Sequence, residues 1–185
     1  DVSGATDISV TASNDSIIDA TVAAVSGSLA FGGSTGVAVA IGASAAINYI
    51  GVDQRGRGMG EVHAYINNSD MSATGNLIVT AESTMNIDAV GLAAAVGLSA
   101  TASDSIALGG AGAGTGNTIA VSVQAYIETN TDSDGVKAGS ITVTAENDSA
   151  IDVTTGAASV QAAFGGGNTV AFSVAIAAAV NHIHN

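Results

Sequence analysis

Hydrophobic and polar residues alternate with a period of two over long stretches of the chain that carry no charge. Residues 37–47 place Val, Ile and Ala at every second position and Gly, Ala and Ser between them, and residues 170–180 repeat this arrangement. Alternation of this length predicts β-strands, because successive side chains of a strand point to opposite faces. Gly-rich corners at Gly32-Gly33 and Gly165-Gly166-Gly167 predict the turns between strands.

Three short blocks recur in the same order and at the same spacing. They are Val-Thr-Ala at 10–12, 79–81 and 143–145, Ile-Asp at 18–19, 87–88 and 151–152, and Asn-x-Ile at 48–50, 117–119 and 181–183. Equivalent positions are offset by 69 and then by 64 residues, and Asp1, Asp70 and Asp134 keep the same register. These blocks predict tandem copies at residues 1–69, 70–133 and 134–185, of which the last is truncated.

Strands arranged in tandem copies predict an all-β protein, a parallel β-solenoid (β-helix-like) that forms one segment over residues 1–185. The segment holds about 2.7 copies of 64–69 residues. Because a copy of this length is long for a single coil, we expect two or three coils per copy. The chain contains 24 Gly and no Pro, so nearly every backbone N–H can join a ladder and the sheets can pack closely.

Two helical alternatives need weighing. Residues 20–52 and 153–185 carry no formal charge and are long enough for transmembrane helices, but they contain few Leu or Phe and lack flanking Lys or Arg. A soluble helical array is the other alternative, since Ala is the best helix former, but the high Gly content opposes it. We therefore expect strands and no membrane span.

One feature does not fit an isolated solenoid. After Asp19 both faces of the predicted strand are apolar or small, although a solvated face should be polar. Either each long strand lies between two layers, or the flat faces of neighbouring solenoids meet. The second copy also has Gly110, Gly112, Gly114 and Gly116 where the other copies have larger residues, for which we expect a locally thinner coil.

The charge balance excludes several functions. The chain has 3 Lys and Arg against 16 Asp and Glu, a formal net charge of −13, which excludes a nucleic acid partner and disfavours an anionic membrane surface. It has no Cys, so disulfides, thiolate catalysis and zinc knuckles are excluded. No nucleophile elbow or phosphate-binding loop is present, and we expect a protein that is not an enzyme.

A calcium site is the best candidate for local chemistry. The segment 130–135 reads Asn-Thr-Asp-Ser-Asp-Gly and resembles the first half of a calcium loop, with Asn130, Asp132 and Asp134 as candidate ligands. The acidic residue expected at loop position 12 is absent, because Ile141 stands there, and a polar turn ending in Asp-Gly is the alternative interpretation.

Two other sets of residues are weaker candidates for a metal site. Asp19, Asp88 and Asp152 would lie about 10–14 Å apart if two or three coils separated them, too far to share an ion. His182 and His184 point the same way on a predicted strand and supply only two ligands. We interpret the aspartates as solvated carboxylates and the histidine pair as incidental.

The Val-Thr-Ala and Ile-Asp blocks, the Ala/Val/Gly strands with a Gly-Gly corner, Asn-x-Ile and Ala-Tyr-Ile (64–66 and 125–127) together resemble the repeats of giant secreted bacterial surface proteins. Such repeats occur in large filamentous adhesins and leukotoxin-like proteins. The resemblance implies an extracellular, non-enzymatic β-solenoid that serves as a stalk or filament on the cell surface. It identifies no receptor.

The leading hypothesis is a structural segment that associates with itself, head to tail or laterally, through β-ladders and small apolar faces, and that requires no cofactor. We expect either a piece of a longer array or a processed subunit that stacks head to tail. The alternative is an adhesive module in which loops 51–62 and 128–139 recognise a glycan or another cell-surface partner, with or without calcium. A third hypothesis, ice binding, rests on the single Thr-x-Thr pair at 142–144.

Overall fold

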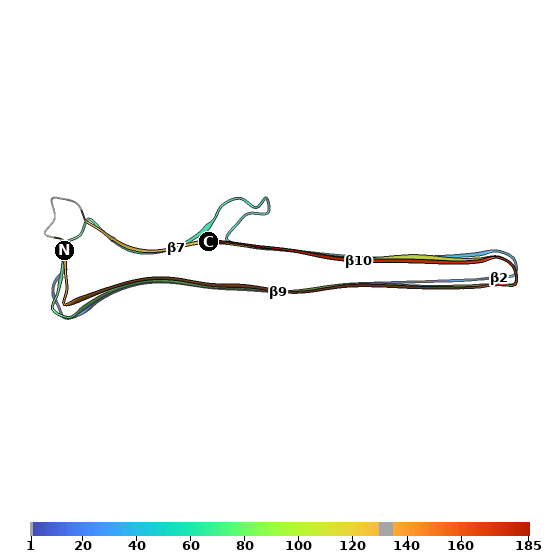
Figure 1. Ribbon diagram of the computed structural model, residues 1–185, viewed down its shortest axis with the longest axis horizontal. Helices are drawn as coiled ribbons and strands as arrows, with labels where there is room; N and C mark the ends of the chain where they lie inside the picture. Colours follow the sequence, from blue (N-terminus) through green and yellow to red (C-terminus); the bar gives the residue numbers. More distant parts are fainter. Residues whose placement is uncertain (1, 130–134) are drawn as a thin grey trace.

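The computed structural model describes residues 2–129 and 135–185, and all regular elements of these residues are β-strands (Figure 1). The strands are β1 (Val2–Ala5), β2 (Ile8–Gly32), β3 (Gly36–Ile50), β4 (Gly60–Asn67), β5 (Met71–Ala73), β6 (Asn76–Thr101), β7 (Ser105–Glu128), β8 (Val136–Lys137), β9 (Ser140–Phe164) and β10 (Thr169–His184). The described residues contain no helix that is long and apolar enough to cross a membrane. The prediction of an all-β protein is confirmed.

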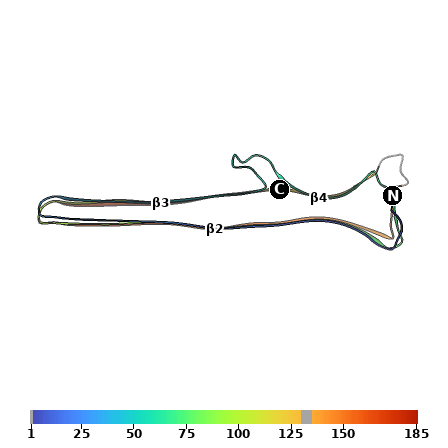
Figure 2. The same ribbon diagram turned by 180° about the vertical axis from the view of Figure 1, so that it is seen from behind.

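The strands form two long layers and one short sheet, and every strand pair is parallel. One layer contains β2, β6 and β9, and the other contains β3, β7 and β10, with β4 also paired to β7. The layers run side by side along the whole molecule and are joined by a turn at one end, while β1, β5 and β8 form the short sheet at the other end, near the N-terminus (Figures 1 and 2). Each layer therefore takes one strand from each copy, in copy order.

The offsets between the copies are the offsets of strand pairing. Val10 pairs with Val79 and Val79 with Val143, so the 69- and 64-residue spacings measured in the sequence are the register of the ladder. Each copy consequently runs once through the two layers, and the expectation of two or three coils per copy is wrong. The reason is strand length: β2 and β6 have 25 and 26 residues, so two long strands use most of a copy.

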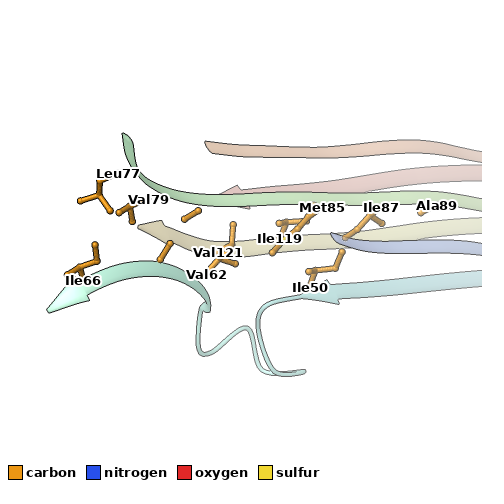
Figure 3. Close-up of a cluster of buried hydrophobic side chains, with 12 residues drawn as sticks. Ile50, Val62, Ile66, Leu77, Val79, Met85, Ile87, Ala89, Ile119 and Val121 are labelled. Carbon is orange, nitrogen blue, oxygen red and sulfur yellow. The ribbon is translucent and has the colours of Figure 1, made fainter. Parts of the chain in front are cut away.

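The half of the molecule near the N-terminus has a conventional hydrophobic core (Figure 3). Leu77, Val79 and Ile87 of β6 point into the space between the layers and meet Ile119 and Val121 of β7, and none of these five side chains is more than 1% exposed. Burying a large aliphatic side chain contributes about 1.5–3 kcal/mol. This core holds the layers together beside the short sheet.

In the half of the molecule near the turn, the two layers pack on alanine. The cluster between them consists of Ala40, Ala93, Ala95, Ala111 and Ala113. The layers approach so closely that a Cβ added to Gly42 would collide with the carbonyl oxygen of Ala94. Small side chains are therefore a requirement of this half, because a larger inward residue would force the layers apart.

The row of glycines in the second copy does not thin this core. Gly110 and Gly116 flank Gly112 and Gly114 on β7, and all four lie on its outward-facing side, where Ile41 and Ile47 of β3 are also exposed. A Cβ added to Gly112 or Gly114 would meet open space. The expectation of a thinner coil is wrong, because the missing side chains belong to the outer surface.

Two glycine-to-alanine substitutions test this packing. Gly42→Ala should lower the free energy of unfolding by about 1–3 kcal/mol, because the added methyl group overpacks the space between the layers. Gly112→Ala, the matched control, should leave the stability unchanged or raise it slightly, since Ala restricts the unfolded chain. Urea unfolding followed by circular dichroism measures both, and equal effects would contradict the inward and outward assignment.

Candidate assembly surfaces

Both ends of the stack present open strand edges. Within the described residues, β2 and β3 of the first copy pair on one side only, with β6 and β7, and β9 and β10 of the third copy do the same. Open edges expose rows of N–H and C=O groups that can pair with another chain. The third copy pairs with the second in the register that the second has with the first. The edge of β9 and β10 thus offers the pattern that the edge of β2 and β3 fits.

A ladder of asparagine side chains crosses the three copies and has a direction. Asn48 donates from Nδ2 to Oδ1 of Asn117 at 2.7 Å, and Asn117 donates from Nδ2 to Oδ1 of Asn181 at 2.9 Å. Asn117 is 1% exposed, so both of its bonds lie away from water. In this ladder Asn181 acts as an acceptor and Asn48 as a donor. A further copy stacked on the third would extend the ladder by accepting from Asn181.

Three aspartates at turns tie each copy to the next. The Oδ1 atom of Asp7 accepts the backbone N–H of Asn76 at 2.7 Å, and that of Asp104 accepts the N–H of Asn168 at 2.8 Å. Asp70 accepts the N–H of Gly135 at 3.0 Å in the same way. The acidic residues at the turns therefore have a structural role, and they repeat from copy to copy. Asp1 and Asp134, which share the sequence register of Asp70, lie outside the described residues.

The aspartates of the Ile-Asp blocks are direct neighbours. Asp19 pairs in register with Asp88, and Asp88 with Asp152, so the expected separation of two or three coils is wrong. Adjacent strands lie about 4.8 Å apart. All three side chains are exposed on the outer face of the β2-β6-β9 layer, as expected for solvated carboxylates. Like charges at this spacing repel each other, and exposure to water limits the cost.

Beyond this polar region, both outer faces become apolar, and we name this surface the apolar band. It comprises the outward positions of 23–31, 90–100 and 156–164 in one layer and of 37–47, 106–116 and 170–180 in the other. Val25 and Ile41, one on each face, are 82% and 71% exposed. The two apolar parities seen after Asp19 are thus resolved: small residues point inward and larger ones outward.

The predicted calcium ligands Asn130, Asp132 and Asp134 lie outside the described residues, and the calcium site stays a prediction. Residues 2–129 and 135–185 contain no group of three or more His, Cys, Asp or Glu placed to hold a metal ion. His182 and His184 stack with their ring centroids 6.0 Å apart on the exposed strand β10 and offer two ligands.

The first proposed recognition loop is a short, self-contained turn. Ile50 pairs with Ile119 and Gly60 with Val121, so residues 51–59 are inserted opposite Ala120, and residues 60–62 already belong to β4. Within the insertion, the carboxylate of Asp53 accepts the backbone N–H groups of Arg57 at 2.9 Å and of Arg55 at 2.8 Å. These bonds and the guanidinium of Arg57, 3.1 Å away, hold the pKa of Asp53 below its usual value.

Sequence reasoning missed a depression beside this insertion. It has a volume of about 510 Å³ and lies between β2 and β4, with Asn14, Glu61 and His63 among its lining residues. It opens at the outer edge of the first copy, where the insertion interrupts the second layer. A copy stacked on that edge would cover it. No pattern in the sequence marks it, because its walls come from separate strands.

The asparagine ladder can be tested by removing its central member. Asn117→Ala should lower the free energy of unfolding by about 1–3 kcal/mol, because it leaves the amides of Asn48 and Asn181 without their buried partner. Asn86→Ala is the matched control, since Asn86 lies on the outer face and bonds only to Asp88, at 3.3 Å. Urea unfolding should separate the two variants, and an equal loss in both would argue against a stabilising ladder.

Comparison with protein-family models, with curated proteins and with solved structures finds no match to this chain. The resemblance to repeats of secreted bacterial surface proteins therefore stays a prediction. What the protein does is argued below from the open edges, the asparagine ladder and the apolar band.

Proposed function

We propose that the chain is a structural repeat segment of an extracellular bacterial surface filament or adhesin stalk, and that it has no enzymatic activity. In this proposal the two layers and the short sheet form the successive sides of a β-solenoid with one coil per copy. Copies of the chain associate head to tail through their open edges. The single observation that carries the proposal is the unchanged register between the copies, which ends at edges that fit each other.

The mechanical role follows from the length of the ladders. The pairing of β6 with β9 alone joins 25 residues of each strand in unbroken register. A load applied along the stack is shared among many parallel backbone hydrogen bonds, which have to break together. The Asn48–Asn117–Asn181 ladder adds side-chain bonds in the same direction. Such a stack is long and stiff without a bulky core, as a stalk requires.

The alternative of an adhesive module has weaker support. The insertion at 51–59 satisfies its own polar groups, with Asp53 bonded to Arg55 and Arg57. Part of the second loop, 128–139, is the short strand β8, which pairs with β5. We therefore assign assembly, rather than recognition by these loops, as the main function.

The direction of the asparagine ladder allows a specific test of head-to-tail stacking. Asn181→Asp keeps the acceptor for Asn117 but removes the donor that would reach the next copy, and it places a charge on the stacking edge. We expect the variant to fold, as judged by circular dichroism, and to form no filaments in electron microscopy under conditions in which the wild type does.

Asn185→Asp is the matched control for this test. It adds the same charge to the same copy, and its side chain keeps the acceptor role toward Asn147, at 2.7 Å. Filaments should persist in this variant. Wild-type filament length with Asn181→Asp, or the absence of filaments from the wild type, would argue against the proposed stacking.

Calcium is a separate part of the proposal. A chain of net charge −13 repels itself, and divalent cations would relieve this repulsion. With Asn130, Asp132 and Asp134 as ligands, added calcium should raise the melting temperature, and the double variant Asp132→Ala with Asp134→Ala should abolish the rise. Thermal unfolding with and without a chelator measures this. An unresponsive wild type would end the calcium proposal and leave the stacking proposal intact.

A further inference from the structure

The half of the molecule near the turn has an inverted polarity. Its polar side chains point into the narrow space between the layers; they include Ser26, Ser28, Ser44, Ser99, Thr115 and Gln161. Thr115 and Thr155 also bond to each other across the layers at 2.9 Å. Soluble proteins place such residues outside and large apolar residues inside. Here the inner positions are small or polar, and the outer positions of the apolar band are all apolar.

Charge is absent from both faces of this region. Residues 20–52 and 153–185 carry no formal charge, and within 89–127 the one charged residue is Asp104, which lies in the turn. Exposed apolar patches larger than a few hundred Å² mark interaction sites. At about 4.8 Å per strand and 3.3 Å per residue, three strands of about ten residues give each face about 500 Å².

The apolar band has the thickness of the bilayer interior. Its segments contain about nine to eleven residues, or about 30–36 Å at 3.3 Å per residue. The hydrocarbon core of a bilayer is about 30 Å thick. Polar groups bound the band on both sides: Ser34, Asp104 and Asn168 lie in the turns, and Asp19 and Asp88 stand on the opposite side.

We propose that the apolar band sits in the hydrocarbon layer of a lipid bilayer, with the turn at 33–35 reaching the far headgroups and the charged half remaining in water. The occupant has to surround the band, because both faces are apolar at the same level. A second copy would cover one face only and bury about 1,000 Å² in total, less than the roughly 1,600 Å² of a standard interface. Lipid chains cover both faces at once.

This inference rests on the proposed stacking. A bilayer penalises unpaired N–H and C=O groups, so the edges of β2, β3, β9 and β10 have to be paired before the band enters it. Stacked copies supply that pairing, and the filament would lie along the membrane with its charged margin outside. The net charge of −13 gives no attraction to anionic lipids, so we expect binding to neutral lipids that salt does not weaken.

Flotation with phosphatidylcholine vesicles tests the band directly. The wild type should float with the vesicles in low and high salt and in the presence of a chelator. Val25→Asp with Ile41→Asp places one charge on each face and should reduce the floated fraction at least tenfold. Ile17→Asp is the control, because Ile17 is 68% exposed on the same layer as Val25 but outside the band, and it should float like the wild type.

Cysteine labelling tests whether the turn crosses the bilayer. The chain has no Cys, so Ser34→Cys at the turn and Arg55→Cys in the inserted loop are each the single thiol. On vesicles, a membrane-impermeant maleimide should label Arg55→Cys and leave Ser34→Cys unlabelled until detergent is added. Equal labelling of both positions on intact vesicles would overturn the transmembrane placement.

The outcomes separate this inference from the proposed function. Filaments that do not float would overturn the inference and leave the stacking proposal standing. Loss of flotation with Asn181→Asp would support the dependence on stacking, and unchanged flotation would overturn that dependence. A soluble wild-type dimer that Ile41→Asp converts to a monomer, with no vesicle binding, would identify the band as a contact between copies and overturn the lipid assignment.

Discussion

The structure depends on one constraint, the parallel pairing of each strand with its equivalent in the next copy. In this register every residue stands beside its counterpart, so any property of one copy becomes a row across the stack. Val79 lies between Val10 and Val143, and Asp88 lies between Asp19 and Asp152. Favourable rows, such as the asparagine ladder, are multiplied by stacking, and unfavourable rows, such as the aspartates, are tolerated only where water reaches them.

The same constraint explains why the two halves differ. Near the N-terminus the inward rows are Leu, Val and Ile, which build a core of ordinary thickness. Near the turn the inward rows are Ala, Gly and Ser, so the layers approach until backbone and methyl groups touch, and the larger residues are left on the outside. One molecule thus combines a conventional soluble half with a half whose polarity is inverted. Assembly and the proposed contact with lipid follow from different parts of it: the edges and the faces.

Several functional features could not be read from the sequence because they depend on spatial neighbours. The depression lined by Asn14, Glu61 and His63 arises where an insertion in one layer faces an intact strand of the other. The turn aspartates Asp7 and Asp104 bond to backbone groups of the following copy, more than 60 residues away. The sequence shows such residues as isolated polar positions, and only the stacking of copies supplies their partners.

The sequence by itself determined the strand content, the tandem copies and their offsets of 69 and 64, because alternation and repetition are local properties of the chain. It did not determine that each copy runs once through the layers, since strand length depends on where the turns form. Nor did it determine which parity faces inward. Alternation is symmetric between the two faces of a strand, and after Asp19 both parities are apolar. The close approach of the two layers decided this, because only the Gly, Ala and Ser rows fit between them.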